Sequence, residues 1–331
     1  MDTRSNAPIR RLPRLAAALA IVGLALSGTG ALAAYPDKPI KLVVGYPPGG
    51  AGDTVARLFA GPLAERLGQP VVVENRPGAG AVVAAQQVVS APADGHTIFF
   101  TGNSTLTINP YTFKSLPYDP RSSFTPLGMV AALPLVLLTT PDGPSTVAAF
   151  VDRARAEPQK WTFGSYGLGN AGHFAGELLN AEAKLAVVHV PHSGSSPNLT
   201  ALIGGHIPMA VDTALASVPQ VRAGKLKALA TFSDKRLPSL PEVPTIAEAG
   251  YPGAAIESWL LFLAPAKLPA DVEKRLSDAL ADAARQPAVV QKILDANIVP
   301  VYQDGASVAR RIDVELRQMK GVAERAGVKP Q

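Results

Sequence analysis

The sequence predicts an α/β protein built from two domains that face a common cleft. Short apolar runs rich in β-branched residues alternate with segments of helical periodicity, which is typical of parallel sheets covered by helices on both faces. A glycine-rich loop between a predicted strand and a predicted helix occurs twice, at residues 46–53 and 166–173. Because the two loops lie in different halves of the 331-residue chain, we expect each domain to contribute one of them to the cleft.

The composition is that of a globular protein, with 47% hydrophobic and 17% charged residues. The sequence contains no cysteine, which excludes disulfides, a thiol nucleophile and cysteine-ligated metal. The formal net charge is +5, and much of it comes from the four Arg among residues 1–33. The sequence has no basic stripe with interleaved aromatic residues, so we expect no nucleic-acid partner.

Residues 1–33 are predicted to be a cleaved secretory signal peptide. Four arginines precede an uncharged run from Leu15 to Ala34, and the run contains Ala31-Leu32-Ala33, which is an A-x-A cleavage signal. The alternative is an uncleaved membrane anchor, because the run is about long enough to span a bilayer. With cleavage near Ala33 or Ala34, we expect a monomer in the bacterial periplasm.

The first glycine-rich loop follows a predicted strand at residues 40–44 and precedes helical periodicity from Thr54 to Leu67. Its sequence is Tyr46-Pro47-Pro48-Gly49-Gly50-Ala51-Gly52-Asp53, and its glycines allow bare backbone N–H groups to approach a ligand. The helix start adds unpaired donors and the positive end of a dipole, so the loop predicts an anion site without a cationic side chain. The alternative is a plain turn in which Asp53 caps its helix.

Two further strands and a helix are predicted before residue 133. Residues 71–73 and 96–101 are strand-like, and the Ala/Val-rich residues 79–89 between them are predicted to be helical. The loop after the second of these strands lies at the carboxyl edge of a parallel sheet, where ligands bind. Asn103 and Ser104 in this loop are therefore candidate ligand-binding residues.

The second half of the chain repeats this order of elements. The second glycine-rich loop, Tyr166-Gly167-Leu168-Gly169-Asn170-Ala171-Gly172-His173, follows a predicted strand and precedes a helix that continues to Leu179. The other predicted elements are strands at 135–138, 161–165, 187–190, 209–211, 226–231 and 260–263, helices at 147–156 and 196–203, and three helices after residue 270. Residues 236–250 are rich in Pro and predicted to be irregular.

Several motifs occur in an order that is typical of one family. They are Tyr46-Pro47-Pro48-Gly49-Gly50, Glu74-Asn75-Arg76-Pro77-Gly78, Gly164-Ser165 with His173, and Leu240-Pro241-Glu242-Val243-Pro244-Thr245. In these motifs the chain resembles the Bug-type, TctC-like solute receptors of tripartite tricarboxylate transporters. The resemblance implies a two-lobed type 2 periplasmic-binding-protein fold with the ligand cleft between the lobes. It also implies a discontinuous first lobe, residues 34–133 plus 257–331, and a second lobe, residues 134–256.

The resemblance further implies that backbone N–H groups, hydroxyls and bridging waters from both lobes hold a carboxylate. Carried over to this sequence, it points to Tyr46, Gly49, Gly50 and Asp53 in the first lobe and to Ser165, Gly169, Asn170, Ala171 and His173 in the second. We expect His173 to brace the second loop by a hydrogen bond, and the alternative is a direct contact with the ligand. Three positions depart from the family pattern: His192 stands where Tyr is usual, Asn170 where Ser or Thr is more frequent, and Ala81 where Gly is common.

Asp212 and Thr213 follow a predicted strand and are further candidates for the cleft. A carboxylate such as that of Asp212 could bind the amino group of an amino-acid ligand. The alternative is that Asp212 caps a helix or braces a loop.

Three other functions are compatible with parts of the sequence. Gly167-x-Gly169-x-x-Gly172 matches a dinucleotide fingerprint, but the next predicted strand does not end in the expected acidic residue. Ser165 is a candidate hydrolase nucleophile, but its flanking glycines lack the required spacing. His189, His192 and His206 are candidate metal ligands, although residues 189 and 192 on an extended chain point to opposite faces.

We therefore expect a receptor that catalyses no reaction and requires neither a cofactor nor a metal. We expect it to capture a small carboxylate and to deliver it to the permease subunits of a tripartite tricarboxylate transporter. A di- or tricarboxylate, an amino acid and an aromatic acid are the candidate ligands. The alternative is a receptor that reports its ligand to a signalling partner.

Overall fold

The computed structural model describes residues 1–3, 35–325, 328 and 330. The chain divides into two units, Met1–Asp37 and Lys38–Gln331, and everything described below lies in the second. The predicted signal peptide falls almost entirely in residues 4–34, outside the described residues. Among the described residues, no helix has the length and apolar character needed to cross a membrane.

The first sheet has six strands in the order β11-β4-β10-β3-β1-β2. The bounds are β1 Ile40–Val44, β2 Val71–Asn75, β3 Thr97–Gly102, β4 Phe124–Leu133, β10 Ser258–Pro265 and β11 Val299–Asp304. β2 and β3 flank β1 in parallel, whereas β10 pairs antiparallel with β3 and β4, and β11 pairs antiparallel with β4. The sheet is therefore mixed, and not the purely parallel sheet that the strand–helix alternation predicts.

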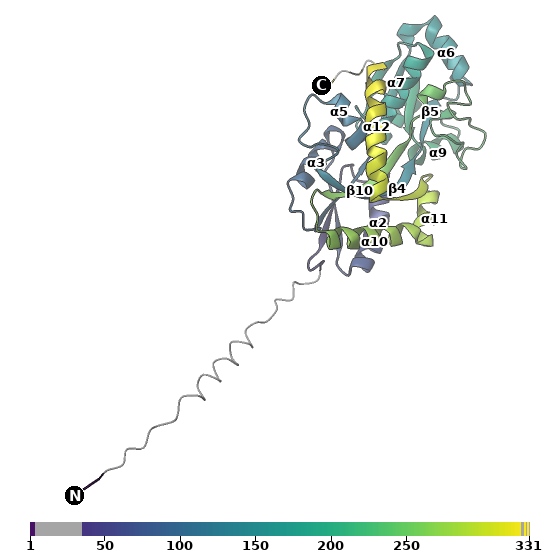
Figure 1. Cartoon of the computed structure of the whole chain (residues 1–331). Helices are drawn as coiled ribbons and strands as arrows, with labels where there is room; N and C mark the ends of the chain where they lie inside the picture. Colours follow the sequence, from purple (N-terminus) through teal and green to yellow (C-terminus); the bar gives the residue numbers. More distant parts are fainter. Residues whose placement is uncertain (4–34, 326–327, 329, 331) are drawn as a thin grey trace. The chain divides into compact units, whose positions relative to one another are not determined.

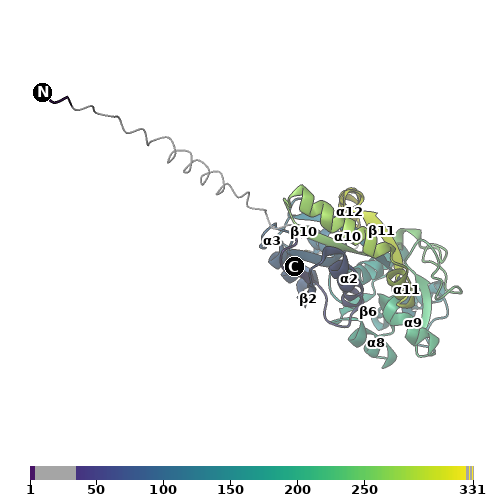
Figure 2. The ribbon, with the colours of Figure 1, turned by 90° about the horizontal axis from the view of Figure 1, so that it is seen from below.

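Helices cover the first sheet and connect its strands. They are α2 Ala51–Leu67, α3 Val82–Val89, α4 Ser104–Thr107, α5 Asn109–Thr112, α10 Ala270–Arg285, α11 Pro287–Asp295 and α12 Gly305–Arg325. α2 and α10 lie side by side (Figure 1, Figure 2). A single 3-10 turn, η1 Ala79–Ala81, directly precedes α3.

The second sheet has five strands in the order β7-β6-β8-β5-β9. The bounds are β5 Leu135–Thr139, β6 Thr162–Ser165, β7 Val188–Pro191, β8 Met209–Thr213 and β9 Lys227–Thr231. Its helices are α6 Val147–Ala156, α7 Ala171–Ala183, α8 Ser195–Ile203 and α9 Ala214–Arg222. β7 and β8 flank β6 in parallel, as the repeated strand–loop–helix order predicts, and β5 is antiparallel to β8 and β9.

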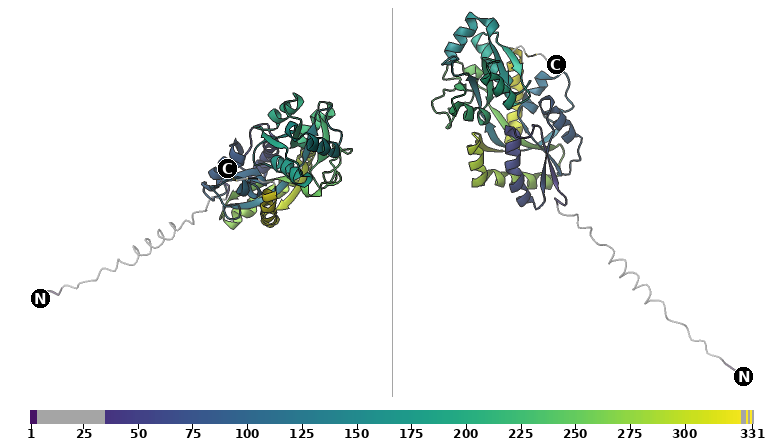
Figure 3. Two further views of the ribbon diagram at one scale, coloured as in Figure 1. Left: turned by 90° about the horizontal axis from the view of Figure 1, so that it is seen from above. Right: turned by 180° about the vertical axis from the view of Figure 1, so that it is seen from behind.

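The chain passes from the first sheet to the second at Pro134, between β4 and β5, and it returns between β9 and β10. α12 packs against the hydrophobic cores of both sheets. Its Ile312 and Leu316 belong to the core beside the first sheet, whereas Val322 and Ala323 belong to the core beside the second. Figure 1 and Figure 3 show α12 in yellow running along both parts of the fold. The helix therefore bridges the two halves independently of the strand crossings.

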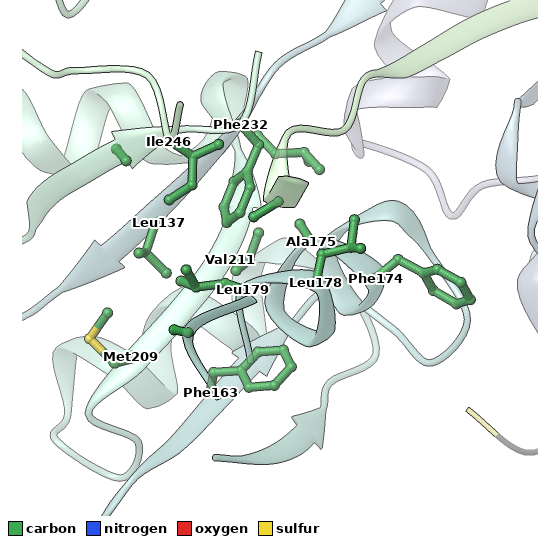
Figure 4. Packing of buried hydrophobic residues seen from close by; sticks show 14 of the residues in the cluster. Leu137, Phe163, Phe174, Ala175, Leu178, Leu179, Met209, Val211, Phe232 and Ile246 are labelled. Carbon is green, nitrogen blue, oxygen red and sulfur yellow. The ribbon is translucent and has the colours of Figure 1, made fainter. Parts of the chain in front are cut away.

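The core beside the second sheet fixes where the second glycine-rich loop lies. Figure 4 shows Phe163 of β6 close to the helix that carries Leu178 and Leu179. A Cβ atom on Gly176 of α7 would lie 2.1 Å from the Phe163 ring, so α7 approaches β6 more closely than any larger residue would allow. This contact places the start of α7 directly beyond the carboxyl end of β6, which is where the loop lies.

Candidate functional site

A cleft of about 550 Å³ lies between loops of the two sheets. The first sheet contributes the loop after β1, the segment before α3 and the start of α4. It also contributes the last residue of β4 and the first residue of β10, next to the points where the chain passes between the sheets. From the second come the loop after β6 and the residues after β7. The lining residues are Gly45, Tyr46, Pro47, Pro77, Gly78, Ala79, Gly80, Ala81, Ser104, Thr105, Leu133, Tyr166, Gly167, Leu168, Gly169, Asn170, His192, Ser193 and Ser258.

The cleft brings together five of the residues that the sequence predicted for the site. These are Tyr46, Ser104, Gly169, Asn170 and His192. Nine others do not line it: Gly49, Gly50, Asp53, Asn103, Ser165, Ala171, His173, Asp212 and Thr213. Most of these nine make hydrogen bonds that hold the loops and helix starts in place.

Asp53 does not line the cleft but stabilises the first loop by hydrogen bonds. Its Oδ2 accepts the backbone N–H of Gly49 at 2.9 Å and Nε of Arg57 at 2.9 Å, and its Oδ1 accepts Nδ2 of Asn75 at 2.8 Å. Burial opposes ionisation of Asp53, but these hydrogen bonds and the charge of Arg57 together hold the pKa of its carboxyl below the usual value. The backbone N–H of Gly50 donates to the carbonyl of Pro47 at 3.3 Å. The N–H groups of both glycines are thus used inside the loop.

His173 does the same in the second loop. Its Nδ1 accepts the backbone N–H of Gly169 at 3.2 Å, which is the brace that the sequence predicted for this residue. Asn170 is the N-cap of α7, because its Oδ1 accepts the backbone N–H of His173 at 3.0 Å. The Nδ2 group of Asn170 makes no hydrogen bond to the residues that the structure describes, and Asn170 lines the cleft. Ala171 is buried in the core at the first turn of α7.

Next to the second loop, the ring of the buried His173 stacks on the ring of the half-buried His189. The rings of His173 and His189 are 4.0 Å apart and nearly parallel. Burial lowers the pKa of His173 to about 4, and burial together with the neighbouring His173 and His192 lowers the pKa of His189 to about 3. Both rings are therefore neutral near pH 7.

Ser165 lies 2.8 Å from Nε2 of His189, a distance that a hydrolytic serine and its base would also show. However, Ser165 is fully buried, and its hydroxyl donates to the carbonyl of Gly167 at 2.7 Å. Ser165 does not line the cleft. The geometry therefore favours a role in shaping the loop over a role as a nucleophile.

Two tyrosines face the cleft, one from each loop. A Cβ on Gly52 would lie 2.1 Å from the ring of Tyr46, and a Cβ on Gly172 would lie 2.7 Å from the ring of Tyr166. Each ring is thus seated on a glycine in the first turn of the helix that follows. Burial raises the pKa of Tyr46 and of Tyr166, and the proximity of Tyr46 raises the latter further. Both hydroxyls stay protonated and can donate hydrogen bonds.

Asp212 lies at the end of β8 with both carboxylate oxygens occupied. Its Oδ1 accepts the hydroxyl of Ser195 at 2.5 Å and the backbone N–H of Thr213 at 2.7 Å, and its Oδ2 accepts Nδ2 of Asn198 at 2.8 Å. Burial raises its pKa, although these hydrogen bonds oppose the shift. Asp212 therefore joins β8 to the start of α8, as the loop-bracing alternative predicts. Thr213 is the N-cap of α9, because its hydroxyl accepts the backbone N–H of Ala216.

Asn103 points toward α12. Its Nδ2 donates to Glu315 Oε2 and to the carbonyl of Glu257, both at 3.2 Å, and its Oδ1 accepts the backbone N–H of Trp259 at 3.3 Å. Asn103 thus connects the loop after β3 to α12 and to the chain returning from the second sheet. The next residue, Ser104, is the one that lines the cleft.

Residues 78–81 are a part of the site that the sequence analysis does not assign. Gly78, Ala79, Gly80 and Ala81 all have positive φ, at 128°, 46°, 60° and 69°. Alanine rarely adopts such a conformation, and strained backbone of this kind is concentrated at functional sites. Gly78, Gly80 and the presence of Ala81 where the family commonly has Gly were the available signals. The positive φ of Ala79 could not be predicted from its identity.

The other histidines are separated by the fold. His192 lines the cleft, and its buried Nδ1 has no hydrogen-bond partner among the described residues. His189 is engaged with Ser165. Within the described part of the chain, no group of three or more His, Cys, Asp or Glu side chains is arranged to hold a metal ion.

A second cavity, of about 460 Å³, lies where the chain crosses between the sheets. Ala132, Pro134, Ile256 and Glu257 come from the crossing segments. The remaining walls are supplied by residues 233–239 and by the end of α11 and the start of β11. This cavity shares no lining residue with the cleft between the glycine-rich loops.

Comparison with known proteins places the chain in a family. A family model described as the tripartite tricarboxylate transporter family receptor matches residues 55–328. Among solved structures, Rpa4515 from R. palustris with adipate is 32% identical with a TM-score of 0.84, covering 90% of this chain and 100% of that one. MatC from Rhodopseudomonas palustris with bound malate is 30% identical with a TM-score of 0.80, covering 87% and 100%. The periplasmic binding protein BugD is 28% identical with a TM-score of 0.82, covering 90% and 100%.

These comparisons confirm the two-lobed periplasmic-binding fold that the sequence motifs predicted. They also confirm the resemblance on which that prediction was based. The chain belongs to the family of tripartite tricarboxylate transporter receptors.

Proposed function

We propose that this protein is a periplasmic receptor that captures a small carboxylate in the cleft between its two glycine-rich loops. The observation that carries the proposal is that both loops, each at the carboxyl end of a strand and the start of a helix, converge on one cleft of about 550 Å³. The N-terminal end of a helix carries a partial positive charge, which favours a bound anion. The solved relatives Rpa4515 and MatC hold adipate and malate, which are both carboxylates.

The ligand contacts come from the residues that line the cleft. Tyr46 and Ser104 act from the first sheet, and Gly169, Asn170 and His192 act from the second. The other predicted residues position these groups: Asp53 holds Gly49, His173 holds Gly169, and Asn103 holds the loop that carries Ser104. We assign residues 34–133 and 257–331 to one lobe and residues 134–256 to the other, with the cleft between them.

Neutral donors are sufficient for useful affinity. A hydrogen bond to a charged group contributes roughly 1.5–3 kcal/mol net. Four of them would supply about 6–12 kcal/mol, and micromolar binding corresponds to about 8 kcal/mol. Closure of the two lobes around the ligand, a known motion of two-lobed binding proteins, would bring the second set of donors to it.

After capture, the receptor delivers the carboxylate to the permease subunits of a tripartite tricarboxylate transporter, without chemical change. Removal of residues 1–33 by signal peptidase releases the protein into the periplasm as a monomer. Binding alone would also suit a receptor that reports its ligand to a signalling partner, and the two roles share the same cleft.

The proposal is tested by thermal unfolding of the purified protein with adipate, malate and the uncharged diamide of adipate. We expect at least one acid to raise the melting temperature in a saturable way. Ligand at 100 times its dissociation constant adds about 2.7 kcal/mol to the free energy of unfolding. The diamide, which matches adipate in shape and lacks its charge, should have no effect. Equal stabilisation by the diamide, or none by any of a broad set of carboxylates, would contradict the proposal.

A further inference from the structure

The cavity of about 460 Å³, called the crossing cavity below, and the cleft lie on different sides of the segments that cross between the sheets. At the first crossing, Leu133 lines the cleft, whereas its neighbours Ala132 and Pro134 line the crossing cavity. Successive residues of an extended strand point to opposite sides, which accounts for this division. At the second crossing, Ser258 lines the cleft, whereas the two residues before it line the crossing cavity. Leu133 and Ser258 are paired in register between β4 and β10.

The remaining walls of the crossing cavity come from both halves of the fold. Residues 233–239, which follow β9 of the second sheet, supply one wall. The end of α11 and the start of β11, which belongs to the first sheet, supply the other. A molecule in this cavity would therefore contact parts of both lobes as well as the crossings between them.

Apolar side chains form much of the lining of the crossing cavity. Leu237 and Ile298 are buried, whereas Leu294 is 47% exposed and Val299 is 39% exposed. An apolar molecule seated against these side chains would remove their surface from water, which is favourable. The volume of about 460 Å³ lies within the range of small-molecule sites. Size and lining thus fit a small apolar ligand.

The charged residues of the crossing cavity balance one another. Asp234 and Glu257 are acidic, Lys235 and Arg236 are basic, and all four are exposed, as expected where a cavity meets solvent. Glu257 also forms an ion pair with Arg311 of α12. With two charges of each sign, the lining offers no excess charge to a ligand, so it favours an uncharged molecule.

We propose that the crossing cavity is a second binding site, for a small uncharged apolar molecule, and that its occupation opposes closure of the cleft. Closure turns the lobes about the crossings, so the walls on the other side of the crossings move apart as the cleft narrows. A molecule that contacts both walls loses contacts when they separate, and it therefore favours the open cleft. Because binding linkage is reciprocal, each ligand weakens the binding of the other by the same factor. The site itself goes beyond the proposed function, and only the coupling rests on it.

The site is tested with N-phenyl-1-naphthylamine, an uncharged apolar probe whose fluorescence rises in apolar surroundings. A fixed amount of probe is titrated with the protein, and we expect a saturable increase. Leu294→Gln places an amide in the cavity wall and should weaken probe binding by at least about fivefold. Ile203→Gln is the matched control, because Ile203 is 43% exposed at the end of α8 and lines neither cavity. No saturable binding, or equal affinities in the two variants, would overturn the proposal.

The coupling is tested by repeating the probe titration at increasing concentrations of the acid that binds the cleft best. We expect the dissociation constant of the probe to rise by at least about fivefold and then to level off, because both ligands can be bound at once. A rise without limit would place the probe in the cleft and overturn the proposal. An unchanged constant would overturn the coupling and leave the site standing. If no acid binds the protein, the proposed function and the coupling both fall, whereas the comparison of Leu294→Gln with Ile203→Gln still decides the site.

Discussion

Asp53 and His173 occupy equivalent positions in the two loops that meet at the cleft. Each accepts the backbone N–H of the glycine four residues earlier, Gly49 at 2.9 Å and Gly169 at 3.2 Å. Both glycines have positive φ, 79° and 70°. One brace is a carboxylate supported by Arg57, and the other is a buried neutral imidazole. The same loop geometry is thus stabilised by two different chemistries.

The equivalence extends to the tyrosines. Tyr46 precedes Gly52 by six residues and packs on it, and Tyr166 stands in the same relation to Gly172. Each loop therefore contains, in order, a tyrosine, a glycine with positive φ, the N-cap residue of the helix, a glycine on which the tyrosine ring packs, and a residue that accepts the N–H of the first glycine. This unit occurs once on each side of the cleft, and in both loops its tyrosine lines the cleft.

Replacing either seating glycine should displace its tyrosine. In Gly52→Ala and Gly172→Ala, the new methyl group would overlap the ring of Tyr46 or Tyr166. We expect each variant to weaken carboxylate binding by at least about tenfold, because overpacking moves the ring away from its position in the cleft. Calorimetric titration with the best-binding acid measures the effect.

Gly61→Ala is the matched control on the same helix. No atom lies within 4 Å of the added Cβ at this position, so the affinity should match that of the unchanged protein. If Gly52→Ala and Gly61→Ala bound the acid equally well, the packing of Tyr46 would have no part in binding.

His173 should make the stability of the folded protein sensitive to acid. The pKa of His173 falls from its usual 6.5 to about 4 in the folded protein, because burial disfavours the charged ring. The unfolded chain therefore takes up a proton at a higher pH than the folded one. Stability that is present above pH 6.5 should be lost as the pH falls toward 4, by up to roughly 3 kcal/mol from this group.

Urea unfolding of the unchanged protein and of His173→Asn between pH 4 and pH 8 tests this prediction. Asn can accept the N–H of Gly169 but does not titrate, so the variant should lose less stability on acidification. The ring of His189, stacked at 4.0 Å, and Glu177 Oε1, at 3.8 Å, face His173 and remain in the variant. Parallel pH profiles for the two proteins would exclude His173 as a source of acid sensitivity.

The strained segment before α3 offers a stabilising substitution. Ala79 has a φ of 46° and is exposed, so Ala79→Gly removes the strain without removing buried surface. We expect this variant to unfold with a free energy higher by about 1 kcal/mol. Ala81→Gly removes strain at a φ of 69° but also a methyl group buried in the core, and it should gain less. A larger gain at position 81 than at position 79 would contradict this explanation.

Two substitutions at Asn170 distinguish its role as a helix cap from its contact with a charged ligand. Asn170→Asp and Asn170→Ser both retain an oxygen that can cap α7, so both variants should fold with similar stability. Asp places a negative charge in the lining of the cleft and removes the free Nδ2 donor. We expect Asn170→Asp to bind the acid at least about tenfold more weakly than Asn170→Ser. Similar affinities in titration would place the ligand carboxylate away from residue 170.

Local sequence signals predicted much of the fold. The β-branched run at β1 predicts the strand with its observed bounds, and both glycine-rich loops lie between a strand and a helix as expected. β4 was not predicted, because Pro126 and Gly128 interrupt its apolar run although it is paired on both sides. β11 was not predicted because it is partly exposed, contains Pro300 and shows no clear alternation.

The roles of individual residues depend on contacts between residues that are far apart in the sequence. Asp53 belongs to a loop that looks like an anion site, but its partner Asn75 reaches it because β1 and β2 pair with Val44 opposite Asn75. Asn103 likewise turns to Glu315, 212 residues away. Spacing within a motif cannot show which way such side chains turn. The motif therefore identified the loops correctly, while the cleft lining required the tertiary structure.

The most direct test of the account is a crystal structure of the protein with the acid that binds most tightly. We predict that a ligand carboxylate lies in the cleft of about 550 Å³, within hydrogen-bonding distance of residues from both glycine-rich loops, with Asn170 Nδ2 among its donors. Density for the acid in the cavity of about 460 Å³ at the strand crossings, with the cleft free of it, would contradict the central claim.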